Sequence, residues 1–167
     1  MNVILFTLST MSCAVYHPQL VDIPLINKKG AGRINAGISP LGFHGTVSVG
    51  ITRKIAIQTF GSVGGDHKYY VQEGIGYYKD LGNKKVMELY SGFGYGYGDA
   101  YNDANPGDLF GHYQVYFTQF NFGKVDCDFA HGDFGVALKT GLLHSKLTDR
   151  NYYARNGPPF ESTGIYT

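Results

Sequence analysis

The feature that most constrains the fold of this chain is an alternation of side-chain character with a period of two residues. From residue 30 onward, short segments place an apolar residue at every second position and a small or polar residue between. In 54–63, for example, Ile55 and Ile57 alternate with Ala56 and Gln58. Because successive side chains of a β-strand point to opposite faces, the pattern predicts strands with one apolar face. It does not fit the 3.6-residue period of a helix.

Turn-forming residues separate these segments. Gly, Asn, Asp and Pro cluster between them, as in 64–67 and 102–108, and these residues favour the backbone angles of tight turns. The predicted strands are 30–39, 43–52, 54–63, 68–80, 85–99, 111–125, 133–147 and 162–167. Eight antiparallel strands of about ten residues make the smallest closed barrel. We therefore expect an all-β protein, an antiparallel up-and-down β-barrel of about eight strands.

The two ends of the chain differ from this body. Residues 1–13 are uncharged and mostly apolar, which predicts a secretory signal. Cys13 directly after Ser12 resembles a bacterial lipoprotein processing site, and the resemblance implies lipidation of Cys13. An ordinary signal peptide and a buried first strand are the alternatives. Residues 14–29 are expected to be an extended tether, and 30–167 the barrel domain. The first Lys comes only at residue 28, and the last predicted strand is short. We therefore expect truncation at both ends and a barrel that could be incomplete at its C-terminus.

Charge and motif spacing argue against several functions. The chain has 14 Lys and Arg against 13 Asp and Glu, a net charge of +1, which gives no basic field for nucleic acid. Segment 126–133 gathers Asp, Cys and His, but without paired metal-ligand spacing a hairpin turn is expected there. His144 and Ser145 are neighbours on a strand and point to opposite faces, so they cannot act together as in a serine hydrolase. We expect no catalytic residue, no metal and no cofactor.

The residues between the apolar positions indicate which face lies inside. They are mostly Gly, Ala, Ser and Gln, whereas a strand face in water normally carries Lys, Glu, Thr and Arg. The narrow interior of an eight-stranded barrel suits small residues, and the glycines of 92–98 would make room there for Tyr90 and other large side chains. Three charged residues, Arg33, Glu88 and Lys139, would then lie in the interior, where they could neutralise one another.

Two other features bear on a membrane location. Tyrosine suits the boundary between membrane and water, and many aromatic residues lie towards segment ends. These residues are Tyr69, Tyr70, Tyr77, Tyr78, Tyr95, Tyr97, Tyr101, Phe110, Tyr113, Tyr152 and Tyr153. Glu73 argues the other way, because it shares the apolar face of its strand and would lie in lipid at a cost of about 2–4 kcal/mol. A β-bulge could rotate Glu73 inward.

The Cys13 context, the stretch G-F-G-Y-G-Y-G-D-A-Y and the eight short strands together carry a resemblance. The chain resembles the small outer-membrane β-barrel proteins of Gram-negative bacteria, several of which carry lipoprotein signals. The resemblance implies an outer-membrane location, membrane lipid as a partner and a structural or surface-binding role without catalysis, and it names no protein partner. Two alternatives stay open. One is a secreted or periplasmic soluble barrel or sandwich that binds an apolar ligand, and the other is a barrel enzyme that modifies lipids.

Overall fold

The computed structural model describes residues 21–39, 42–65, 67–100, 109–127, 132–149 and 160–166. Their regular structure is entirely β. The strands are β1 (Gly32–Ser39), β2 (Gly42–Gly50), β3 (Ile55–Val63), β4 (Tyr69–Gly82), β5 (Lys85–Ala100), β6 (Leu109–Cys127), β7 (Gly132–Asp149) and β8 (Phe160–Tyr166). These bounds lie close to the predicted ranges, because period-two alternation and turn residues mark a strand and its limits directly.

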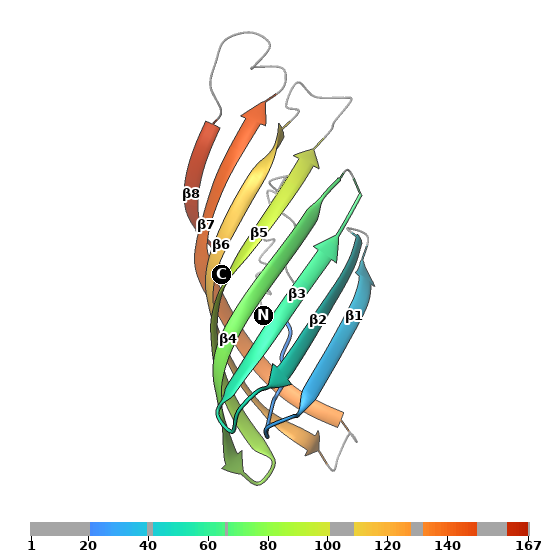
Figure 1. The fold of residues 1–167 in the computed structure, drawn as a ribbon, viewed down its shortest axis with the longest axis vertical. Coiled ribbons are helices and arrows are strands. Elements are labelled where there is room, and N and C mark those ends of the chain that lie inside the picture. The colour runs from blue at the N-terminus through green and yellow to red at the C-terminus, as the bar shows by residue number, and fades with distance from the viewer. Residues whose placement is uncertain are drawn as a thin grey trace, which may run out of the picture.

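All eight strands form one sheet in the order of the sequence, and each is antiparallel to the next (Figure 1). The predicted all-β, antiparallel up-and-down organisation is confirmed. The sheet is not closed into a barrel, since the described pairings run from β1 to β8 without joining those two strands. Strand β8 pairs only with Gly141–Leu147 of β7. The open seam therefore lies between β1 on one side and β7 and β8 on the other, as expected for a barrel that is incomplete.

The connections between strands differ in length at the two ends of the sheet. At one end, here called the turn end, the connections are 51–54, 83–84 and 128–131. At the other, the loop end, they are 40–41, 64–68, 101–108 and 150–159. Asn83 and Lys84 have φ angles of 52° and 63°, which is the pattern of a two-residue type I′ hairpin. The sheet therefore has tight turns at one end and mostly longer loops at the other.

Burial divides the strands from β2 to β7 into an inner and an outer face, whereas β1 at the edge of the sheet is mostly exposed. In β3 and β4, buried and exposed residues alternate one by one. Gln58 and Gln72 are only 2% and 3% exposed, whereas Ile34 and Leu138 are 82% and 67% exposed. The polar and small residues thus lie inside, together with buried aromatic side chains such as Tyr70 and Phe117, and most large aliphatic residues lie outside. This is the orientation predicted from the composition of the two faces.

Glycine and aromatic residues fit together on the inner face. The ring of Tyr90 lies against Gly76, its direct partner on β4, and the ring of Phe117 lies against Gly92, its direct partner on β5. A side chain at either glycine would overlap the ring, so the space exists only because no Cβ is present. The prediction that the glycines of 92–98 make room for large side chains is confirmed for Gly92, Gly94 and Gly96, but it was wrong for Tyr90, because the glycine that faces its ring is Gly76 on β4.

Candidate functional site: outer surface and inner bore

The outer surface of the sheet is a broad apolar face. Large apolar side chains from β1 to β7 are exposed on it: Ile34, Ile38, Phe43, Val47, Ile55, Ile57, Val63, Val71, Ile75, Leu89, Phe93, Phe120, Phe122, Phe134, Val136, Leu138 and Leu142. A soluble monomer rarely exposes a contiguous apolar patch of more than a few hundred Å². A surface of this kind needs an apolar surrounding or a covering partner.

Glu73 lies on this apolar outer face. Its carboxylate accepts a hydrogen bond of 2.8 Å from the hydroxyl of Thr59, its direct partner on β3. The register on both sides of Glu73 is continuous, and the pairing of β4 with β5 shifts only between Asp80 and Gly82. The expectation that a bulge rotates Glu73 inward is therefore wrong. A cross-strand hydroxyl, rather than a change of face, satisfies this carboxylate.

Aromatic side chains gather on the outer face near the loop end. The rings of Tyr69 and Tyr97 stack with centroids 5.9 Å apart, and the Tyr95 hydroxyl lies 2.6 Å from Nδ1 of His112. Tyr69, Tyr95 and Tyr97 are among the residues that the sequence predicts for a membrane boundary, and the structure places all three on the outer face. By strand alternation, two more of the predicted aromatic residues belong to the outer face. Tyr77 lies near the turn end, and Phe110 lies at the loop end, where β6 begins.

Three tyrosines predicted for the boundary lie inside instead. Tyr70, Tyr78 and Tyr113 are at most 2% exposed. The rings of Tyr70 and Tyr113 stack on each other with centroids 5.6 Å apart, because glycines on β5 leave room for both. Sequence position near a strand end therefore did not distinguish the two faces. Tyr101, Tyr152 and Tyr153 lie outside the described residues.

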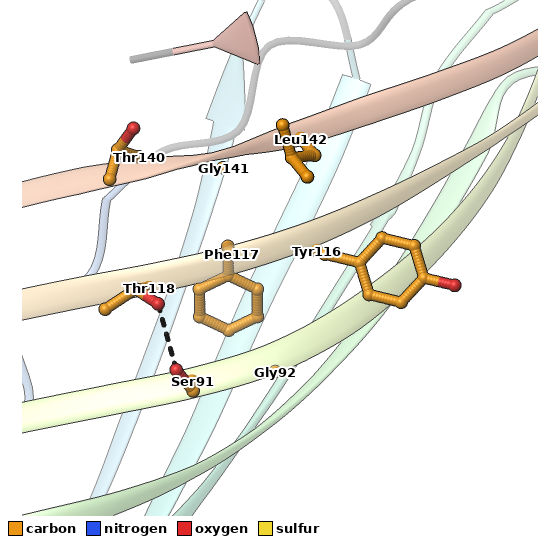
Figure 2. A pocket seen from close by; sticks show the side chains of 8 residues that line it. All are labelled: Ser91, Gly92, Tyr116, Phe117, Thr118, Thr140, Gly141 and Leu142. Atoms are coloured by element: carbon orange, nitrogen blue, oxygen red, sulfur yellow. Dashed lines mark hydrogen bonds between the residues drawn. The ribbon is translucent and has the colours of Figure 1, made fainter. Parts of the chain in front are cut away.

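A shallow groove crosses the outer surface of β5, β6 and β7 (Figure 2). It is lined by Ser91, Gly92, Tyr116, Phe117, Thr118, Thr140, Gly141 and Leu142. The hydroxyl oxygens of Ser91 and Thr118 lie 2.9 Å apart and bond to each other, as the dashed line in Figure 2 marks. The groove exists because Ser91, Thr118 and Thr140 form a cross-strand row of short side chains beside the larger pair Tyr116 and Leu142. Its hydroxyl groups satisfy each other within the protein surface.

Glu88 is one of the three charged residues predicted for the interior, and it is fully buried on the inner face. Each of its carboxylate oxygens accepts two hydrogen bonds. Oε1 accepts the backbone N–H of Ile26 at 2.6 Å and the hydroxyl of Tyr90 at 3.4 Å. Oε2 accepts the side-chain amide of Asn121 at 2.8 Å and the backbone N–H of Leu25 at 3.3 Å. Four donors compensate for the loss of water around this carboxylate.

Lys139 is also buried on the inner face. Its side chain reaches from β7 to β4 across the bore, which is the space on the inner side of the curved sheet. Its ammonium donates to the Gln72 side-chain oxygen at 2.7 Å, and the same oxygen accepts the Tyr70 hydroxyl at 3.2 Å. The ammonium also lies 4.5 Å from the centre of the Phe117 ring, in a cation–π arrangement. These contacts link opposite walls of the sheet through its interior.

Arg33 lies at the seam rather than deep in the bore. Its side chain is 46% exposed and forms an ion pair with Asp133 at the start of β7. Arg33, Glu88 and Lys139 thus have separate described partners, and the expectation that they neutralise one another is not what the described contacts show. The ion pair of Arg33 and Asp133 joins β1 to β7 at the turn end, which the pairing of the strands alone does not.

The described part of segment 14–29 has no regular secondary structure, and it is packed inside the sheet rather than lying outside it as a tether. Leu25 and Ile26 are 3% and 0% exposed. The side-chain amide of Gln119 donates to the carbonyl oxygen of Asp22 at 2.7 Å. The tether interpretation missed this contact, because the two prolines and the absence of a period in 14–29 are equally typical of a linker. The buried polar residues of the inner face were the available signal.

Segment 126–133 and the pair His144–Ser145 carry no candidate chemistry in the residues that are described. Asp126 forms an ion pair with Lys84 at 2.9 Å, and Asp133 pairs with Arg33. Over the described ranges, no group of three or more His, Cys, Asp or Glu is placed to hold a metal ion. Ser145 is buried and belongs to the inner face, and the alternation of β7 puts His144 on the outer face. Cys13 lies outside the described residues.

Comparison with family models, curated proteins and solved structures found no significant match. In the part of the chain that is described, no helix is long and apolar enough to cross a membrane. The features of the molecule that bear on function are therefore the two faces of the sheet and the residues that fill the space on its inner side.

Proposed function

We propose that this chain is an outer-membrane β-barrel protein, with the apolar outer face in lipid and a structural or surface-binding role. The observation that carries the proposal is the direction of the two faces. Exposed Ile, Val, Leu and Phe cover the outside, while Glu88, Lys139 and four buried amide side chains (Gln58, Gln72, Gln119 and Asn121) lie inside. Membrane barrels have this inverted arrangement, whereas a soluble barrel that binds an apolar ligand would place its apolar face inward.

The two ends of the sheet support an orientation in the membrane. Outer-membrane barrels have short turns on the periplasmic side and longer loops on the outside. The turn end would therefore face the periplasm, and the loop end, with its cluster of Tyr69, Tyr95, Tyr97 and His112, would lie at the outer boundary. The loops 64–68, 101–108 and 150–159 would then be available for surface binding.

The open seam sets a condition on this proposal. Hydrocarbon offers no hydrogen-bond partner, so strands in a bilayer must pair along both edges. In the membrane, the outer edges of β1 and β8 and the part of β7 that precedes its pairing with β8 must therefore pair with each other or with a further strand. The ion pair of Arg33 with Asp133 already holds the turn end of this seam together.

Membrane fractionation combined with one pair of substitutions tests the proposal. The full chain, expressed in a Gram-negative host, should sediment with outer membranes and resist washing with alkaline carbonate or urea. Leu138→Arg places a cation in the lipid-facing band and should sharply reduce recovery in the membrane, because such a change costs about 2–4 kcal/mol near the midplane. Lys146→Arg keeps the charge at its place and is the matched control. Release of the unmodified chain without detergent would contradict the proposal.

Lipidation of Cys13 is a separate part of the proposal. Labelled palmitate should be incorporated into the chain and lost in Cys13→Ala, while membrane recovery of the barrel itself depends on its strands and should persist. Incorporation unchanged in Cys13→Ala would assign the lipid to another residue.

A further inference from the structure

The turn-end half of the bore is built around the segment that fills it. A Cβ at Gly50 would overlap the side chain of Ile26, and a Cβ at Gly123 would overlap that of Leu25. Gly135 faces Ile23 in the same way, at 3.0 Å. Three glycines on three different strands thus leave room for three aliphatic side chains of one segment. The compartment is complementary in shape to residues 23–26.

The polar contacts of the compartment recognise main chain rather than side chains. Glu88 accepts the consecutive N–H groups of Leu25 and Ile26, and Gln119 donates to the carbonyl oxygen of Asp22. Asn121 bonds to both Glu88 and Gln119 and fixes their orientation. Because these bonds go to backbone groups, they place no requirement on the side chains of the segment. The glycine-lined spaces add a requirement for aliphatic side chains.

The backbone of Leu25 is strained in a way that serves this contact. Its φ angle is 48°, in the left-handed region that is unfavourable for a residue with a branched side chain. A left-handed residue turns successive N–H groups towards one point and so forms an anion-binding nest. The Glu88 carboxylate lies at that point. The conformation would have no compensation if the segment left the bore.

We propose that the turn-end half of the bore is a peptide-binding site, specific for a segment with three aliphatic side chains and two consecutive N–H groups that a left-handed residue turns towards one carboxylate, and that residues 22–26 are its resident, exchangeable ligand. A segment of the same chemistry from another protein can take the site when the resident segment leaves. The site belongs to the inner face and does not depend on whether the outer face lies in lipid.

The first test measures amide hydrogen exchange of residues 21–29 in the full chain, purified in detergent. A glutamine at position 88 has only one accepting oxygen, so two of the four donors around it lose their acceptor. Glu88→Gln should therefore speed exchange of the segment at least tenfold. Glu73→Gln changes the outward carboxylate and should leave that exchange unchanged. Fast exchange in the unmodified chain, or equal exchange in the two variants, would overturn the assignment.

The second test asks whether the site accepts a peptide in trans. Leu25→Asp and Ile26→Asp together should expel the resident segment from the full chain, because they place carboxylates beside Glu88. A fluorescent synthetic peptide with the sequence of residues 21–28 should then bind this double variant. Unlabelled peptide should displace the fluorescent peptide from it. Binding should fall at least tenfold when Glu88→Gln is added and should persist with Glu73→Gln. If the double variant keeps its β-structure and binds no peptide, the segment is a fixed part of the core and the proposal is wrong.

Discussion

The two halves of the bore are filled by different means. Towards the loop end, the strands fill the space with their own aromatic side chains: Tyr70 lies against Gly94, and Tyr113 lies against Gly96. Towards the turn end, Gly50 and Gly123 face residues of a segment that precedes the sheet. In both halves a glycine faces a large side chain. In the loop-end half that side chain belongs to a strand of the sheet, and in the turn-end half it belongs to the segment that precedes the sheet.

This difference separates what a strand pattern can specify from what it cannot. An aromatic residue and a glycine that pair across two strands are fixed by the register, and their packing is local to the sheet. The turn-end half depends on a contact between Glu88 and backbone groups more than sixty positions earlier in the chain. We therefore expect substitutions at the loop end to affect the whole sheet and substitutions at the turn end to release mainly one segment.

The largest expected effect is at the glycines of the loop-end half and the middle of the bore. Gly92→Val would place a Cβ against the backbone oxygen of Glu73 as well as the Phe117 ring, and backbone cannot move aside as a flexible side chain does. Overpacking costs about 1–3 kcal/mol where the neighbours can shift. Here backbone blocks the new Cβ, so we expect a larger loss of the free energy of unfolding than in any variant below, up to failure to fold. Denaturant unfolding in detergent measures it.

Gly61→Val is the matched control for Gly92→Val. Nothing lies within 4 Å of the position that a Cβ would take at Gly61, and valine favours strands. Its unfolding midpoint should be unchanged or slightly raised. Equal losses in the two variants would mean that the inner face is not closely packed.

The next effect concerns the turn-end half. Ile26 is fully buried, and truncating a buried Ile to Ala costs about 2–5 kcal/mol. If that half is filled by a separable segment, Ile26→Ala should weaken protection of residues 21–29 far more than protection of β4 and β5. Hydrogen exchange resolves the two regions in one sample. Ile34→Ala, at a position 82% exposed, is the control and should change neither. Uniform loss of protection would remove the distinction between the halves.

The sequence predicted the sheet well because its signals are local. Alternation and turn residues give strands, order and direction, and the scarcity of charged residues between the apolar positions gives the inner face. The glycines at 92, 94 and 96 were predicted to make room for large side chains because glycine in a strand interior is costly without such a reason.

The candidate site was only partly predictable from the same signals. Glu88 and Lys139 were placed in the interior by alternation, but alternation gives no partner, and the donors to Glu88 come from a segment with no period of its own. The inward tyrosines were mistaken for boundary residues because position near a strand end does not tell one face from the other. Arg33 finds Asp133 only because the sheet curls, which no single strand encodes.

Glu88 points inward and Glu73 points outward, so replacing each carboxylate by leucine should have opposite effects on stability. Glu73→Leu removes a carboxylate from the apolar surface and should strengthen membrane insertion by about 1–3 kcal/mol, offset in part by loss of the bond from Thr59. Glu88→Leu leaves four donors without an acceptor and should destabilise the turn-end half. Folding into lipid vesicles, titrated with denaturant, measures both. Destabilisation by Glu73→Leu would indicate that the outer carboxylate has a partner in the membrane.

The smallest expected effect is at the seam between β1 and β7, where no strand pairing joins the two edges of the sheet. The Arg33 side chain is 46% exposed and that of Asp133 is 30% exposed, so water screens their attraction. Ion pairs with this exposure contribute about 0–1 kcal/mol, and Asp133→Asn should lower the free energy of unfolding by no more than that. High salt should shrink the difference further, because screening acts on exposed pairs. A loss comparable to that of Ile26→Ala would mean that the seam, and not the filling of the bore, limits the stability of the turn end.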